Sequence, residues 1–103
     1  MKLIETLSEK IADEISDARS YAEMAIENKE SHPELAQTLY ELSQEEMGHM
    51  SRLHGAVADI IEQYKTTKGE PPASMMAVYD YLHKKEIEKA AEAKTLQAMF
   101  KES

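Results

Sequence analysis

Residues 46–49 read Glu46-Met47-Gly48-His49, and they interrupt an apolar pattern that runs through the middle of the chain. From this stretch, steps of four and three residues alternate in both directions, which is the spacing of one face of an α-helix. The positions on this face, called here the Glu-His stripe, are Leu35, Leu39, Leu42, Glu46, His49, Leu53, Ala56 and Ile60. A carboxylate and an imidazole within an apolar stripe are unfavourable unless another group or an ion compensates them. The pattern therefore predicts a helix over residues 33–64 with a polar site at its centre.

The polar pair of this stripe has the spacing of a metal-binding motif. Glu46 and His49 are three residues apart, so both side chains leave one face of a helix and can reach the same ion. Helical bundles that hold two metal ions use Glu-x-x-His on each of two helices and one Glu on each of the other two. The tetrapeptide is common by chance. The alternatives are a hydrogen-bonded pair in the core or an exposed face of a looser bundle.

A second polar interruption occurs in the preceding helix, which is predicted over residues 3–28. Its core series contains one acid and comprises Ile4, Leu7, Ile11, Glu14, Ala18, Tyr21 and Ala25. The short link over residues 29–33 makes the two helices antiparallel neighbours. Glu14 and Glu46 each lie about 20 Å from this turn at about 1.5 Å per residue. We therefore expect Glu14, Glu46 and His49 at one level of the hairpin.

The helix over 33–64 carries further signals. A second stripe beside the first comprises Ala36, Tyr40, Met47, Met50, Val57 and Ile61, which predicts burial over a wide arc. Ser31 and Glu34 predict a capping box, with Pro33 in the first turn. Tyr21 and Tyr40 lie near the level of the proposed ligands, either as packing residues or as hydrogen-bond donors to them.

A third helix is predicted over residues 74–101, after a break that contains Gly69 and two prolines. Its apolar residues concentrate in the first half, at Met75, Met76, Val78, Tyr79, Leu82 and Ile87. We expect it to pack on a partner or on the outside of the bundle. His83 and Glu86 have the reverse order, His-x-x-Glu, and are a weaker candidate for an accessory site. His32 and His54 are expected at the surface.

The composition restricts the class of protein. The chain has 103 residues, enough for one domain, and its helix-forming residues predict an all-α fold. With no cysteine, a metal must be held by carboxylates and imidazoles, which suit iron, manganese or zinc. The net charge of −8 disfavours nucleic acid and anionic membranes as partners. No apolar run approaches a membrane span and an acid follows soon after the first residue, so a cytoplasmic location is expected.

One chain offers half of a dinuclear site. Such a bundle site takes four carboxylates and two imidazoles, whereas Glu14, Glu46 and His49 supply two and one. A second copy related by a twofold axis completes the set. It also covers the face that a two-helix hairpin leaves open. The sequence thus predicts a homodimer that forms a four-helix bundle.

These motifs resemble one half of a ferritin-like or rubrerythrin-like di-iron bundle over roughly residues 10–62. The matching residues are Glu14, Ala18, Tyr21 and Ala25, with Glu45-Glu46-Met47-Gly48-His49 on the next helix. A half-bundle that completes its iron site by dimerising is similar to the encapsulated ferritins. That resemblance implies iron oxidation and an encapsulin shell as partner, although residues 99–103 do not resemble a targeting tail.

The function expected from this resemblance is that of a ferroxidase. Fe(II) is oxidised to Fe(III) by dioxygen or peroxide at a site shared by two chains, with Glu14, Glu46 and His49 as ligands. Further assembly of the dimers stays open. The alternative is a helical dimer that acts as a structural or interaction protein, in which the polar residues only set the register.

Overall fold

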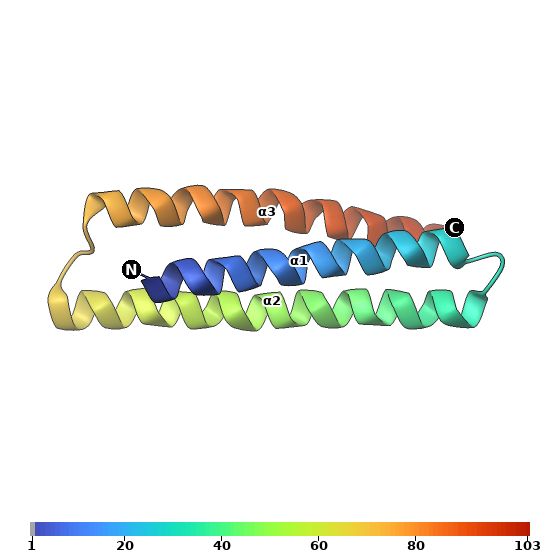
Figure 1. Cartoon of the computed structure of the whole chain (residues 1–103), viewed down its shortest axis with the longest axis horizontal. Coiled ribbons are helices and arrows are strands. Elements are labelled where there is room, and N and C mark those ends of the chain that lie inside the picture. Colours follow the sequence, from blue (N-terminus) through green and yellow to red (C-terminus); the bar gives the residue numbers. More distant parts are fainter. Residues whose placement is uncertain (1) are drawn as a thin grey trace.

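A computed structural model describes residues 2–103 and contains three long helices (Figure 1). They are α1 (Lys2–Asn28), α2 (Pro33–Lys68) and α3 (Ala73–Glu102), and no strand occurs within those residues. The all-α class and the order of the helices are confirmed. The main difference in bounds is at the end of α2, which continues one turn beyond the predicted residue 64.

The helices form an elongated body of 56 × 19 × 18 Å with α1 at its centre. α2 runs antiparallel to α1, while α3 runs in the same direction as α1 (Figure 1). α1 packs along both other helices, whereas α2 and α3 touch only sparsely. α3 therefore belongs to the same body as the hairpin, on the outside of it, as one of the two predictions for this helix stated.

The two connections follow simple backbone rules, with one correction. Gly69 ends α2 with a φ of 83°, a conformation that glycine adopts without strain, and its N–H donates to the Lys65 carbonyl. Pro33 stands in the first turn of α2, as predicted. The predicted capping box is wrong, because His32 occupies the N-cap position without a side-chain cap. Ser31 stands one residue too early, and its hydroxyl contacts His32 Nδ1 at 3.0 Å.

The core of the chain uses mainly the second stripe of α2, whereas the Glu-His stripe contributes one buried residue, Leu39, and two that pack at the edge of the core, Leu53 and Ile60. Five of the six positions named for the second stripe are buried, whereas the Glu-His stripe is mostly half-buried or exposed. The buried members pack against Ile4, Ile11, Ile15 and the alanines of α1. The reason is the position of α3, which closes the side of the hairpin that the second stripe faces. We call the other side, which carries the Glu-His stripe, the open face.

α3 is anchored by its second half, although its apolar residues concentrate in the first half. Its buried residues are Ala93 and Phe100, and the Phe100 ring stacks on Tyr40 at 4.8 Å between centroids. Arg19 of α1 adds an ion pair of 2.9 Å to Glu92. By contrast, the first half leaves Val78, Tyr81 and Ile87 exposed. Small and aromatic residues thus dock α3 more tightly than its aliphatic ones.

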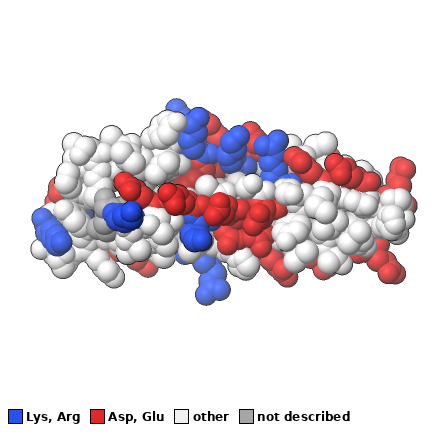
Figure 2. Space-filling view, viewed as in Figure 1, with Lys and Arg blue, Asp and Glu red and all other residues white. Residues whose placement is uncertain are grey.

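Charge is unevenly distributed over the surface. In Figure 2 acidic side chains gather along the middle of the face shown, and basic side chains lie above them along α3.

Within residues 2–103, no helix combines the length and apolarity needed to cross a membrane.

A buried serine ties the three helices together. Ser43 of α2 is fully buried, and its hydroxyl donates to the Ala18 carbonyl of α1 at 2.6 Å. Gln97 of α3 donates to the same hydroxyl at 2.8 Å. One side chain therefore satisfies polar groups of both neighbouring helices.

Replacing Ser43 by alanine should lower the free energy of unfolding by about 1–2 kcal/mol, because it leaves the half-buried Gln97 amide without its acceptor. Urea unfolding followed by circular dichroism measures the change. Ser51→Ala, at an exposed position of the same helix, is the matched control. Equal midpoints for both variants would contradict the role assigned to the Ser43 hydroxyl.

Candidate metal centre

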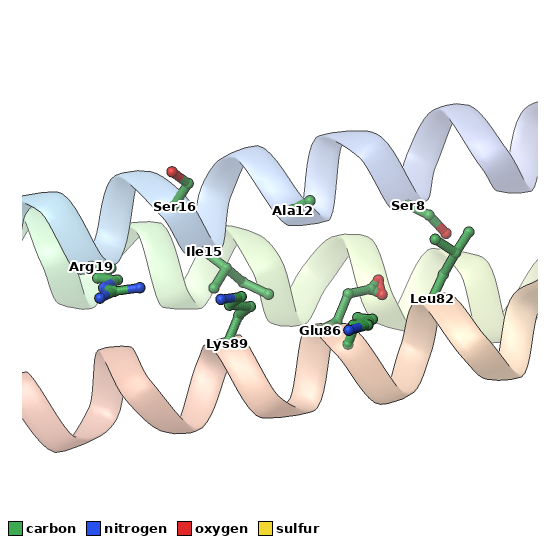
Figure 3. Close-up of a pocket in the computed structure, with 9 residues that line it drawn as sticks. Ser8, Ala12, Ile15, Ser16, Arg19, Leu82, Glu86 and Lys89 are labelled. Atoms are coloured by element: carbon green, nitrogen blue, oxygen red, sulfur yellow. The ribbon is translucent and has the colours of Figure 1, made fainter.

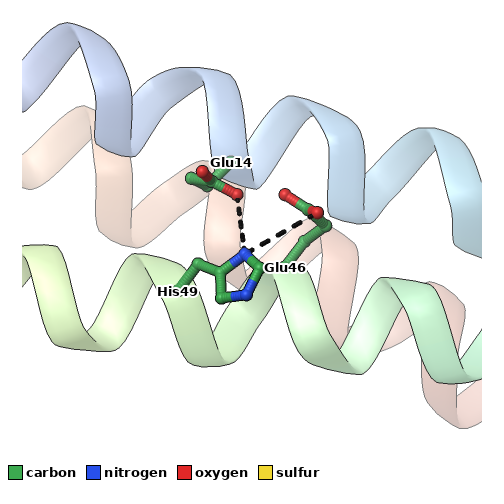
Figure 4. Close-up of side chains that lie close together, drawn as sticks. All are labelled: Glu14, Glu46 and His49. Carbon is green, nitrogen blue, oxygen red and sulfur yellow. Dashed lines mark ion pairs between the residues drawn. The ribbon is translucent and has the colours of Figure 1, made fainter.

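Three potential metal ligands meet at one level of the hairpin, as the sequence predicted. Glu14 comes from α1, and Glu46 and His49 come from successive turns of α2 (Figure 4). His49 Nδ1 lies 3.4 Å from Glu14 Oε2 and 3.8 Å from Glu46 Oε1. One ligand atom from each residue falls within 4.8 Å of the other two, and no other group of three in residues 2–103 meets this criterion.

The site is half-buried on the open face. The side chains of Glu14 and Glu46 are 27% and 18% exposed, whereas His49 is 55% exposed. A shallow cavity of about 390 Å³ borders Glu14, His49, Arg52 and Leu53. Both carboxylates are thus shielded by the hairpin, and the imidazole closes the group on its outer side.

The Glu14 carboxyl group disfavours the charge of Glu46. The pKa of Glu46 is raised from 4.5 to about 7, first because its protonated form hydrogen-bonds with Glu14. Burial and the negative charge of Glu14 raise it further, and His49 opposes the shift. Even so, Glu14 Oε2 is buried and accepts no hydrogen bond within residues 2–103. A buried carboxylate oxygen without a donor is an unfavourable arrangement that a cation relieves.

The donor set and its spacing fit a divalent transition metal. Oxygen and nitrogen ligands at about 2.0–2.2 Å from one ion lie about 2.8–4.4 Å from each other. The distances from His49 Nδ1 to the two carboxylates fall in this range, so small side-chain adjustments suffice for Glu14, Glu46 and His49 to hold one ion together. Carboxylate oxygen with imidazole nitrogen suits iron, manganese or zinc.

The residues named as neighbours of the site take other places. Tyr40 is buried against Phe100, and its hydroxyl accepts a hydrogen bond from Gln44 at 3.1 Å, so it is a packing residue. Tyr21 is half-buried beside the cluster that contains Leu39. A Cβ added at Gly48 meets no atom within 4 Å, so no close approach within this chain requires that glycine.

A second polar cluster was missed. His54 was expected at the surface but is half-buried, and its Nε2 lies 3.2 Å from His83 Nδ1 of α3. A signal was present in the sequence, since His54 continues the second stripe between Met50 and Val57. Where His83 lies relative to that stripe depends on how α3 packs, which the spacing does not reveal.

No family model, curated protein or solved structure matches this chain. The likeness to ferritin-like proteins therefore rests on the motif residues alone and stays a prediction. The geometry of the site is independent of it.

The raised pKa of Glu46 predicts how the stability of the metal-free protein depends on pH. The folded state holds the Glu46 proton more tightly than the unfolded chain does. The stability that this proton contributes is therefore fully present below about pH 4.5 and is lost as the pH rises through about 7. Glu46→Gln keeps a neutral group there. At pH 8 the free energy of unfolding of this variant should therefore exceed that of the parent by about 1–2 kcal/mol, allowing for partial solvent screening.

Urea unfolding of metal-free protein between pH 5 and pH 8 measures this difference. Glu45→Gln changes an exposed neighbouring acid and should follow the parent. A parent stability that rises between pH 5 and pH 8 would show that Glu46 does not retain its proton.

Proposed function

We propose that the protein is a ferritin-like iron oxidase whose site is shared by two copies of the chain. The observation that carries this proposal is the convergence of Glu14, Glu46 and His49 around a buried carboxylate oxygen that has no hydrogen-bond donor. Structural polar residues in a core normally satisfy one another. Here Glu14 Oε2 accepts no hydrogen bond within residues 2–103, although His49 Nδ1 lies 3.4 Å away, and the donor atoms of the three residues are those that iron accepts.

Fe(II) is the substrate in this proposal. Two ions each give one electron, and dioxygen takes both electrons with two protons and leaves as hydrogen peroxide. Glu46 and its counterpart bridge the two ions, His49 binds one ion in each chain, and Glu14 is a terminal or bridging ligand. Hard anionic carboxylates stabilise Fe(III) more than Fe(II), which favours the oxidised pair.

The open face supports the dimer. Its members on α2 are half-buried or exposed apart from Leu39, and Leu35 is 48% exposed. On α1, Leu3 adds a further exposed apolar side chain. The ligands lie near the middle of both helices, so a twofold axis through the site brings two half-sites together and overlaps the hairpins along their length. Two copies then form the four-helix bundle.

Loss of a ligand should abolish iron oxidation. Fe(II) added to the parent protein in air should give one bound Fe(III) per chain, with growth of near-ultraviolet absorbance. In Glu46→Ala or His49→Ala the initial rate should fall about tenfold or more, since a ligand matters at least as much as its supporting residues. Glu62→Gln, an exposed acid on the same helix, should keep the parent rate. Parent protein that binds iron without oxidising it would refute the oxidase.

A charge on the open face should separate the copies. Leu35→Lys places a cation in the proposed interface, whereas Val78→Lys changes a position of nearly equal exposure, 49%, on α3. Mass measured in solution should be that of a dimer for the parent and for Val78→Lys, and that of a monomer for Leu35→Lys. A monomeric parent at micromolar concentration would refute the shared site.

The exposed apolar residues of α3 favour a second candidate function. Val78, Tyr81 and Ile87 form no part of the core, and such residues commonly mark a protein interface. A structural or interaction protein would keep its fold and dimer but take up no Fe(II), so the iron measurement separates the two functions.

A further inference from the structure

The half-buried histidine pair joins the two helices that otherwise touch least. His54 Nε2 of α2 and His83 Nδ1 of α3 are 3.2 Å apart, with 4.7 Å between ring centroids. On its other side the His83 ring stacks on Tyr79, at 5.6 Å and 14° between planes. The contact with Tyr79 therefore supports the His83 ring in its position facing His54.

The separation of the two nitrogens is that of two ligands on one ion. At metal–nitrogen bonds of about 2.0–2.1 Å and tetrahedral angles, neighbouring ligand atoms lie about 3.3–3.4 Å apart. Without metal, one ring must donate its N–H and the other must accept it. A divalent ion can replace that proton with little change in the spacing of His54 and His83.

A carboxylate lies within the same cavity. Glu86 stands one turn after His83 and borders, with both histidines, a cavity of about 380 Å³. It also borders a neighbouring cavity between α1 and α3, floored by Ala12, Ile15 and Leu82 (Figure 3). The Glu86 side chain therefore lies between the two cavities. In the arrangement shown it has not converged with the histidines.

Glu86 is otherwise uncompensated. It forms no ion pair and no side-chain hydrogen bond with any residue from 2 to 103. The cavity that it borders between α1 and α3 is also lined by Arg19, Lys85 and Lys89, but none of these cations forms an ion pair with its carboxylate. A cation at the histidine pair would give this carboxyl group a partner that the protein alone does not provide.

We propose that His54, His83 and Glu86 bind one Zn(II) ion per chain, at a site separate from Glu14, Glu46 and His49. Two imidazoles and a carboxylate are a donor set that zinc accepts, with water in the remaining position. The ion links α3 to α2, so its binding stabilises the fold. The site lies within one chain and does not depend on the dimer or on iron oxidation.

The test uses full-length protein carrying Glu46→Ala and His49→Ala, which removes the first site. Zn(II) at about a hundred times its dissociation constant should raise the melting temperature by about 10–20 °C. Metal analysis after dialysis should give one zinc per chain. Because the first site is disabled, neither result depends on iron binding. Failure of the zinc proposal would therefore leave the proposed function unaffected, and the reverse also holds.

Single substitutions in that background locate the ion. His54→Gln and His83→Gln should each lose the bound zinc and the thermal shift, whereas His32→Gln, an exposed histidine in the first turn, should keep both. Each variant is compared with its own metal-free sample, so a lower starting stability does not obscure the shift. Glu86→Gln should weaken zinc binding about tenfold.

Co(II) gives an independent readout, because its visible absorption reports nitrogen and oxygen ligands at low coordination number. Visible bands in the parent background that vanish in His83→Gln support the site. The proposal would be overturned if the parent background took up no zinc, or if His54→Gln and His83→Gln took up as much zinc as the parent background. The pair would then be a simple hydrogen bond.

Discussion

The placement of two carboxyl groups side by side within a small helical body constrains the rest of this structure. Glu14 disfavours the charge of Glu46, and one Glu14 oxygen is buried without a donor. An isolated hairpin could relieve this by letting the helices separate. Here α3 packs on the opposite side of α1, and Ser43 links α1, α2 and α3 through buried hydrogen bonds. The fold thereby holds a locally unfavourable group together, which is common at sites that bind ligands.

The small residues of α1 make this arrangement possible. Ala18, Ala22 and Ala25 are completely buried, so α1 can lie close to its neighbours. Larger side chains there would push the helices apart and separate Glu14 from the α2 residues. The same helix therefore sets how α3 docks and how far the Glu14 carboxylate lies from Glu46 and His49. The packing of α3 on one side of α1 and the position of Glu14 on the other side thus depend on the same helix.

Helical periodicity was sufficient to predict three helices, their order and the level at which Glu14, Glu46 and His49 meet. It could not decide which of two adjacent stripes on α2 is buried. That choice depends on where α3 packs, and the periodicity of α3 is weak in its second half, where Ala93 and Phe100 anchor it. The His54–His83 pair was missed for the same reason. Ser43 was also overlooked, because a serine within an apolar stripe gives no sign that its hydroxyl joins three helices.

The unequal lengths of the helices have a dynamic consequence. α2 has 36 residues and α1 has 27, so the last turns of α2 extend past the start of α1, where α2 and α3 diverge around it (Figure 1). No residue from 62 to 68 is buried, so few contacts resist fraying there, and the amide hydrogens of this end exchange with solvent by local opening. Glu46 and His49 lie several turns away, beyond Val57 and Ile61, which are buried. The diverging ends of α2 and α3 can therefore open locally without separating Glu14 from Glu46.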